Sequence, residues 1–240
     1  MANPHRYGFR FVRSLSGNDT PQILTLPIAS GYQPGTVNGG GTNVNLNIGD
    51  PVRLVEDGTV QLTQTAQDVS GQDDDSDDFC YGVVVGFPRV IVGGSPRPGS
   101  FFTGGTTYSG GIGGDTAPLV SIIPAAGNIF EVDLDAAPSV TTLSGLMALV
   151  GGVGTMSYSV LTTGTGQPKA NPLLSRSSIV FATANQLQLQ VVGIGKSAFS
   201  CDFTAANIPM QVMWNTLQMA IPSAEVTANS TPAIYGANLE

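Results

Sequence analysis

Acidic side chains crowd one stretch of this sequence, and carboxylate oxygens are the ligands that calcium prefers. Five aspartates fall within residues 73–78, and Asp73, Asp75 and Asp77 alternate as the first ligands of an EF-hand loop do. The pattern then departs from that loop, because its sixth position is Asp78 instead of glycine and its twelfth is Val84 instead of glutamate. We therefore interpret the stretch as a solvated, self-repelling loop and expect no metal or cofactor; a weak calcium site is the alternative.

A second pair of acids, Glu131 and Asp133, could support paired-carboxylate chemistry, because side chains at i and i+2 share one face of a strand. The same alternation is typical of any half-exposed strand, and no further acid, base or nucleophile accompanies the pair. We therefore expect an ordinary strand, residues 129–134, with both acids pointing outward.

This sequence lacks the residues that nucleophilic catalysis requires. His5 is the only histidine, and it precedes every predicted packed element, so a Ser-His-Asp or Cys-His relay has no base. No HExxH, Cys/His zinc spacing, P-loop or dinucleotide-binding motif occurs. We expect no enzymatic activity; a glycosidase-type carboxylate pair from distant strands is the alternative left open.

The composition describes a turn-rich protein with few charges. Its 240 residues include 31 glycines and 16 prolines, and only 11% are charged, against about 25% in typical domains. The surface must therefore be covered largely by Ser, Thr, Asn, Gln and Gly, which suits a protein packed against other subunits. The net charge of −8 opposes the DNA backbone, so we expect no nucleic-acid partner.

The number of cysteines and the lengths of the hydrophobic segments indicate the cellular compartment in which the protein is made. Cys80 and Cys201 are too few for a disulfide scaffold, and Cys80 lies in an apolar run where we expect a core residue. The N-terminus has no hydrophobic signal region, and no apolar run has the length of a membrane span. We expect a protein made in the cytoplasm, without a membrane partner.

Period-2 alternation predicts an all-β fold. Val52 and Leu54, then Val60 and Leu62, alternate on either side of a turn at residues 56–58, and an apolar strand at residues 80–87 returns to the same small sheet. Pro27 restricts residues 23–28 to a sheet edge. We predict antiparallel β-barrel or sandwich modules with long loops and at most one or two short helices.

The best helix candidate is residues 138–150, with Leu143, Met147 and Val150 at spacings of four and three. Strands are expected again at residues 157–161, 178–181, 186–191 and 210–215. The predicted organisation has five parts: an N-terminal arm and edge strand (1–43), a β-hairpin module (44–92), a Gly-rich loop insertion (93–118), the second part of the β body (119–226) and a C-terminal tail (227–240).

Two segments combine aromatic and basic residues in a way that favours contact with a partner. Near the N-terminus the interpretation is evenly divided between an arm, whose aromatics enter pockets and whose arginines pair with acids, and a first strand of the domain itself. The Gly-rich insertion carries aromatics that a flexible linker does not need. The candidate contact residues are Arg6, Tyr7, Phe9, Arg10, Arg13, Phe101, Phe102 and Tyr108.

The order of segments resembles the head decoration, or capsid-cement, proteins of tailed bacteriophages. Residues 1–4 with Tyr7-Gly8-Phe9-Arg10 resemble the start of that family, and Ile48-Gly49-Asp50-Pro51-Val52 resembles its hairpin. The remaining similar segments are residues 80–87, which match its returning strand, and residues 173–177, 188–194 and 210–218, which match its late strands. Each motif is short, and the Asp-rich run and the Gly-rich insertion have no counterpart.

This resemblance implies a structural virion protein without catalytic residues. Such a protein would bind the outside of an icosahedral capsid, bridge major capsid protein subunits and neighbouring copies of itself, and form a homo-oligomer there. A head-fibre or receptor-binding module that recognises glycans is the alternative, although the one tryptophan, Trp214, falls in a core-like alternation. A non-viral surface-layer protein is the third possibility.

Overall fold

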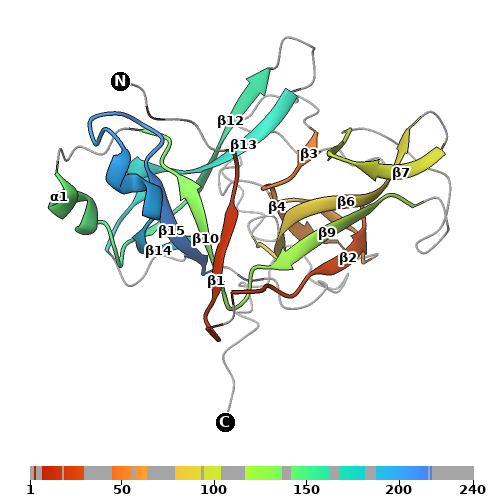
Figure 1. Cartoon of the computed structure of the whole chain (residues 1–240), viewed down its shortest axis with the longest axis horizontal. Helices are drawn as coiled ribbons and strands as arrows, with labels where there is room; N and C mark the ends of the chain where they lie inside the picture. Colours follow the sequence, from red (N-terminus) through yellow and green to blue (C-terminus); the bar gives the residue numbers. More distant parts are fainter. Residues whose placement is uncertain are drawn as a thin grey trace, which may run out of the picture.

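The computed structural model describes residues 3, 7–17, 19–29, 45–55, 58–63, 79–92, 95–103, 117–136, 142–162, 168–181, 188–215 and 217. These residues form an all-β protein, as predicted, with one short α-helix and two 3-10 helices. Two antiparallel sheets lie side by side (Figure 1). A single parallel bridge between Ile28 and Val60 joins the two edges of the six-stranded sheet, and no sheet in the described part of the chain forms a complete barrel.

The first sheet, called the β14 sheet, has the strand order β1-β10-β15-β14-β11. Every neighbouring pair in it is antiparallel. The strands are β1 (Arg10–Ser14), β10 (Asn128–Asp133), β11 (Val153–Gly154), β14 (Leu189–Ile194) and β15 (Pro209–Trp214).

The second sheet, called the β6 sheet, has the order β2-β9-β6-β4-β5, with β7 paired to β6 outside this path. Its strands are β2 (Leu24–Pro27), β4 (Pro51–Leu54), β5 (Val60–Leu62), β6 (Gly82–Val92), β7 (Ser95–Gly99) and β9 (Leu119–Pro124). As Pro27 predicts, β2 is at the sheet edge, where a residue without an N–H leaves no bond unmade.

Two further strand pairs and the helices complete the described structure. One pair is β3 (Leu46–Asn47) with β8 (Phe101–Phe102), so the range predicted as a loop insertion contains both β7 and β8. The other is β12 (Met156–Thr162) with β13 (Pro168–Leu174), a hairpin that projects from the body in Figure 1. The helices are α1 (Leu143–Met147) and the 3-10 turns η2 (Arg176–Ser178) and η3 (Lys196–Ser200).

The predicted hairpin and its returning strand are confirmed. Val52 pairs with Leu62 and Leu54 with Val60, all four side chains are buried, and Gly58 supplies a positive φ of 76° in the turn. The returning strand β6 pairs with the edge of β4 that is opposite β5. The alternation of apolar residues thus identified both the strands and the face they bury.

Two local predictions were wrong. Residues 178–181 contain the end of η2 and a single bridge between Val153 and Val180 instead of a strand. Residues 138–141 of the predicted helix lie outside the described residues, and α1 ends at Met147 instead of residue 150. It also uses another face, because Leu146 and Leu149 are buried while Met147 is 58% exposed. The Thr142 hydroxyl caps α1 by accepting the Gly145 N–H, and turns begin directly after Met147, which rotates Val150 away from the core.

One hydrophobic core spans both sheets, with Trp214, Phe130, Ile122 and Ile28 among its fully or almost fully buried side chains. The chain crosses between the sheets at residues 125–127, because β9 belongs to the β6 sheet and β10 to the β14 sheet. Burying both sheets in a common core makes the described structure one packed body.

The N-terminal segment is part of this body, which favours the strand interpretation over the free arm. The Phe9 ring is 3% exposed and contacts Trp214 and Phe130, with ring centroids 5.2 Å and 6.5 Å away. Strand β1 then pairs with β10. Farther upstream, the side-chain amide of Asn3 donates to the carbonyls of Asp202 and Ala206.

The two sheets meet at a close backbone contact that we call the Gly8–Gly49 joint. The Phe9 N–H donates to the Gly49 carbonyl at 2.8 Å, and the Gly49 N–H donates to the Val84 carbonyl of β6 at 2.9 Å. Both glycines have positive φ, 67° at Gly8 and 94° at Gly49. A Cβ atom on Gly8 would lie 2.7 Å from the Gly49 carbonyl oxygen, so the two backbones approach this closely only without side chains.

This joint predicts different costs for two glycine substitutions with similar φ. Gly8→Ala should lower the free energy of unfolding by about 1–2 kcal/mol for the left-handed conformation and by about 1–3 kcal/mol more for the overlap with Gly49. Gly17→Ala is the control, because Gly17 has a φ of 85° but a Cβ atom there would meet nothing within 4 Å, so only the first cost applies. Urea unfolding of both variants measures the two losses of unfolding free energy. Equal losses would contradict the claim that the Gly8–Gly49 joint excludes a side chain.

Candidate functional site

The predicted site residues divide into those the structure describes and those it does not. Arg6, Tyr108 and the three candidate calcium ligands Asp73, Asp75 and Asp77 lie outside the described residues. Within the described ranges, no group of three or more His, Cys, Asp or Glu side chains is placed to hold a metal ion. No helix among the described elements has the length and hydrophobicity to span a membrane.

The remaining contact candidates differ in how accessible they are. Phe9 and Phe102 are buried at 3% and 5% exposure, so their side chains belong to the core. Arg13 and Phe101 are exposed, the latter at 37%, and they keep the surface position that a contact needs. Tyr7 and Arg10 are partly buried and bind polar groups of the same chain. The role of these residues as subunit contacts stays a prediction.

Arg10 joins the two acids of β10 in an ion triad. Its Nη2 lies 3.0 Å from Glu131 Oε1 and 3.2 Å from Asp133 Oδ1. The Asp133 side chain is fully buried, so the expectation that both acids point outward was wrong for it. Strand β1 lies on β10 with Arg10 opposite Glu131, and this register brings the guanidinium over both carboxylates.

The triad links strands β1 and β10. Both carboxylates accept from the same guanidinium. Glu131 is also confined by Gly195, where a Cβ atom would lie 2.3 Å from Oε2. The two acids therefore neutralise a cation at the interface of β1 and β10.

A second buried acid, Asp50, lies beside the Gly8–Gly49 joint. It is fully buried, and its Oδ2 accepts the Asn47 N–H at 2.7 Å. Its Oδ1 lies 3.4 Å from the hydroxyl of Tyr7, and that hydroxyl donates to the Ala170 carbonyl of β13. Burial raises the pKa of Asp50 well above its ordinary value, against smaller opposing effects of its hydrogen bonds and of Lys169.

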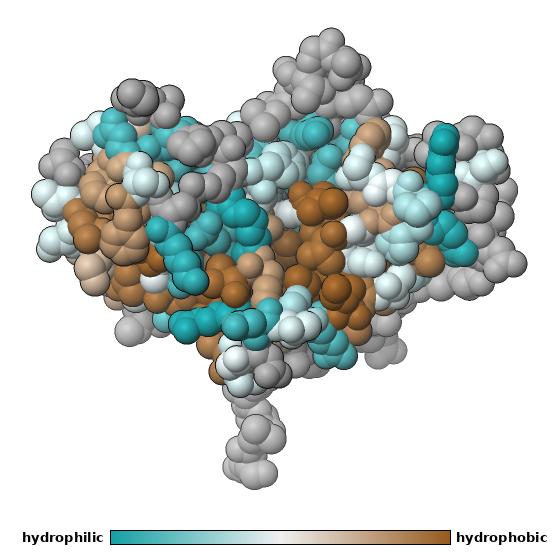
Figure 2. Space-filling model, viewed as in Figure 1, coloured by the Kyte–Doolittle hydropathy of each residue, from teal (hydrophilic) through white to brown (hydrophobic). Residues whose placement is uncertain are grey.

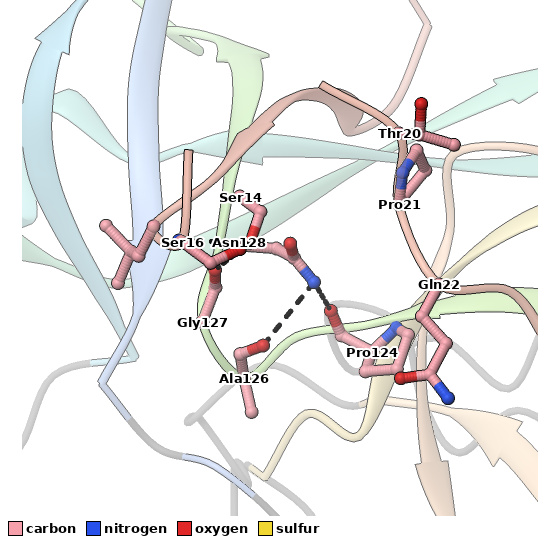
Figure 3. Close-up of a pocket in the computed structure, with 10 residues that line it drawn as sticks. Ser14, Ser16, Thr20, Pro21, Gln22, Pro124, Ala126, Gly127 and Asn128 are labelled. Atoms are coloured by element: carbon pink, nitrogen blue, oxygen red, sulfur yellow. Dashed lines mark hydrogen bonds between the residues drawn. The ribbon is translucent and has the colours of Figure 1, made fainter. Parts of the chain in front are cut away.

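A polar hollow of about 480 Å³ lies between the end of β1 and the turn that joins β9 to β10. Figure 3 shows Ser14, Ser16 and Asn128 on one side of it and Thr20, Pro21 and Gln22 on the other. No lining residue is charged; the others are Leu15, Pro124, Ala126 and Gly127. The hollow can therefore offer hydrogen bonds and small apolar contacts but no charge.

Asn128 has a fixed orientation in this hollow. Its Nδ2 donates to the Pro124 carbonyl at 2.8 Å and to the Ala126 carbonyl at 3.4 Å, and Figure 3 shows its oxygen turned away from both. Ser14 and Ser16 share a hydrogen bond of 2.8 Å between their hydroxyls. The fixed amide thus presents an acceptor to anything that enters the hollow.

The two cysteines do not form a disulfide, and Cys80 is a core residue as predicted. Burial raises the pKa of the Cys80 thiol, which keeps it protonated and unreactive at neutral pH.

Sequence patterns did not predict the burial of the Asp50 carboxyl or the presence of the hollow. Asp50 stands in Gly49-Asp50-Pro51, where an aspartate is an ordinary turn residue, and burial of its carboxyl depends on Tyr7 and Ala170 from distant segments. Gly127-Asn128 is a turn signal that could have placed the β9–β10 connection. The partners across the hollow come from residues 14–22, which no local pattern connects to that turn.

Comparisons of this chain with known protein families, curated protein sequences and solved structures gave no match.

The ion triad predicts a large difference between two arginines of the same strand. Arg10→Met should lower the free energy of unfolding by about 2–3 kcal/mol, because both acids of β10 lose their guanidinium partner while partial exposure of Arg10 limits the loss. Arg13→Met is the matched control and should change stability by less than about 0.5 kcal/mol, since Arg13 is exposed. The double variant Arg10→Met/Asp133→Asn should recover part of the stability that Arg10→Met loses, as measured by thermal unfolding. Equal losses of unfolding free energy in the two arginine variants would refute the stabilising role of the triad.

Proposed function

We propose that this protein is a structural component of a phage virion that binds the outside of an icosahedral capsid. In this role it bridges major capsid protein subunits and neighbouring copies of itself. The observation that carries the proposal is a surface with few charges and several large exposed hydrophobic side chains, on a body held rigid by one core. Contiguous exposed hydrophobic areas are typical of sites of protein contact.

The exposed hydrophobic side chains lie in β8, α1 and η3 and in the turns and connections next to strands. They include Leu15, Ile23, Ile48, Phe101, Met147, Val150, Phe181 and Phe199, with exposures from 36% to 67%. Figure 2 shows hydrophobic atoms gathered in the middle of one face, where the two sheets meet, and again toward the side that holds α1 and β14. A protein that contacts several subunits at once needs such areas in more than one place.

Three of the segments that carry the resemblance to capsid-cement proteins meet in space. Residues 7–10 contact residues 48–52 at the Gly8–Gly49 joint, and Gly49 is bonded to Val84 of the returning strand. Their shared role in this chain is to build the body. Recognition of the capsid then falls to exposed side chains, of which Arg13 and Phe101 were already contact candidates.

The hollow between β1 and the β9–β10 turn favours a second candidate function, a glycan-binding module of the virion. Its lining is uncharged and rich in hydroxyl and amide groups, which suits a neutral ligand with many hydroxyls. The lining contains no aromatic ring on which a sugar could stack, so the structural function remains our first choice.

Capsid binding is tested with assembled, expanded capsids that lack this protein. The purified protein should cosediment with them and raise the temperature at which they release their genome. Phe101→Ala should weaken binding about tenfold or more if this ring is a main contact, because such anchors contribute at least about 1.4 kcal/mol. Protein that leaves capsids unbound and unstabilised would refute the proposal.

A variant of the hollow separates the two functions. Thr20→Trp should fill the hollow without touching the core, because Thr20 is exposed. It should leave capsid binding unchanged under the structural proposal. Loss of adsorption to host cells with normal capsid stability would instead support the glycan-binding module.

A further inference from the structure

The β12–β13 hairpin leaves one backbone edge open, and the register shows which groups lie there. The Ser175 N–H donates to the Thr155 carbonyl at 3.0 Å, so that carbonyl points toward β13. The direction of the backbone groups alternates from one residue of a strand to the next. Because the register continues without a shift to the end of β12, the N–H and C=O groups of Val160 and Thr162 point away from β13.

Two further features agree with this direction. The Met156 N–H has the same direction as those of the two residues above, and it donates outward to Gln188 Oε1 at 3.0 Å. Pro168 and Pro172 occupy the positions of β13 at which a missing N–H breaks no bond to β12. Within the described residues, no hydrogen bond reaches the outer side of Val160 or Thr162.

The edges of the two larger sheets are closed or protected against pairing. At β11, Val153 and Val180 donate to each other at 2.8 and 2.9 Å, and at β5 the Ala29 N–H donates to the Val60 carbonyl. Strand β2 contains Pro27, and β7 contains two prolines and an arginine. Strand β1 carries two arginines and a bulge. Covering segments, prolines, charges and bulges are the devices that keep sheet edges from pairing with other chains.

The outer edge of β13 is covered as well, whereas that of β12 is not. The Ala170 carbonyl accepts from the Tyr7 hydroxyl, and the Leu174 carbonyl accepts the Asp135 N–H at 3.0 Å. Strand β12 contains neither proline nor a charged residue, and residues 163–167 beyond it are also uncharged. From Val160 onward, the edge of β12 therefore lacks the protections that the other edges have.

We propose that this edge of β12 pairs with the same edge of a second copy of this chain. A two-fold axis at Leu161 places Val160 opposite the partner's Thr162, in antiparallel orientation. Each such pair exchanges two hydrogen bonds between N–H and C=O groups. The two hairpins become one larger sheet, which suits a hairpin that projects from the body (Figure 1). An uncharged edge lets identical copies meet without repulsion.

The pairing names a contact through which neighbouring copies bridge on the capsid, and for that setting it rests on the proposed function. The hydrogen bonds are few, so free molecules associate weakly. A capsid that holds copies side by side raises their effective concentration and favours the pairing. The contact itself forms between the free proteins at high concentration, where it can be tested without capsids.

A cysteine on the two-fold axis tests the pairing. Leu161→Cys, in a Cys201→Ser background that leaves only the buried Cys80, places two thiols on residues whose Cα atoms are about 4.5 Å apart in a non-hydrogen-bonded pair. Ser159→Cys is the matched control, because its two copies are about 13 Å apart and cannot be bridged. Under mild oxidation at millimolar concentration, position 161 should form disulfide dimers at least about tenfold faster. Equal rates, or no dimer at position 161, would overturn the proposal.

Val160→Pro removes an outward N–H and leaves the bonds between β12 and β13 intact. Added to Leu161→Cys, it should slow dimer formation at least about tenfold. Thermal unfolding should show the same midpoint with and without the proline, which establishes that the fold is kept. Unchanged cross-linking in this variant would show that the backbone edge is not the contact and would also overturn the pairing.

The same cysteine comparison on capsids that lack this protein separates the pairing from the proposed function. Cross-linking at position 161 in solution, by protein that does not bind capsids, would support the pairing and refute the proposed function. Capsid binding without cross-linking at position 161, in solution or on the capsid, would do the reverse.

Discussion

The close approach of the Gly8 and Gly49 backbones is the contact on which the rest of the described structure depends. It brings the N-terminal segment against the turn that opens the β4–β5 hairpin, and through the Gly49 N–H against β6. Phe9 then enters the core beside Trp214, and β1 follows along β10. Two sheets that could have been separate modules thereby share one hydrophobic core.

This arrangement changes where recognition should be sought. The aromatics and arginines near the N-terminus have the composition of a contact arm. In the structure, however, Phe9 packs in the core and Arg10 forms ion pairs with two acids of β10. Under our proposal, the exposed hydrophobic side chains and the uncharged hollow are the candidate sites of contact with partners. A rigid body with such a surface suits a structural role in an assembly.

Local patterns predicted the all-β class, the β4–β5 hairpin and the edge position of Pro27, because alternation and turn residues act between neighbours in the chain. They left the N-terminal segment undecided, since its strand partner β10 and its ring partner Trp214 lie more than a hundred residues away. The burial of Asp133 and Asp50 was missed for the same reason: each needs a distant group, Arg10 or Tyr7, to be satisfied. The α1 face was missed because a five-residue helix is too short for its spacing to define a face.

The claim that both sheets form one body through this joint has a direct test in equilibrium unfolding. Trp214 is the only tryptophan and lies in the β14 sheet against Phe9, so its fluorescence reports that sheet, while far-UV circular dichroism reports all strands. The two signals should follow one denaturant transition with the same midpoint and slope. Separate transitions, with Trp214 exposed while much of the β signal persists, would show two modules that fold independently and would contradict the account.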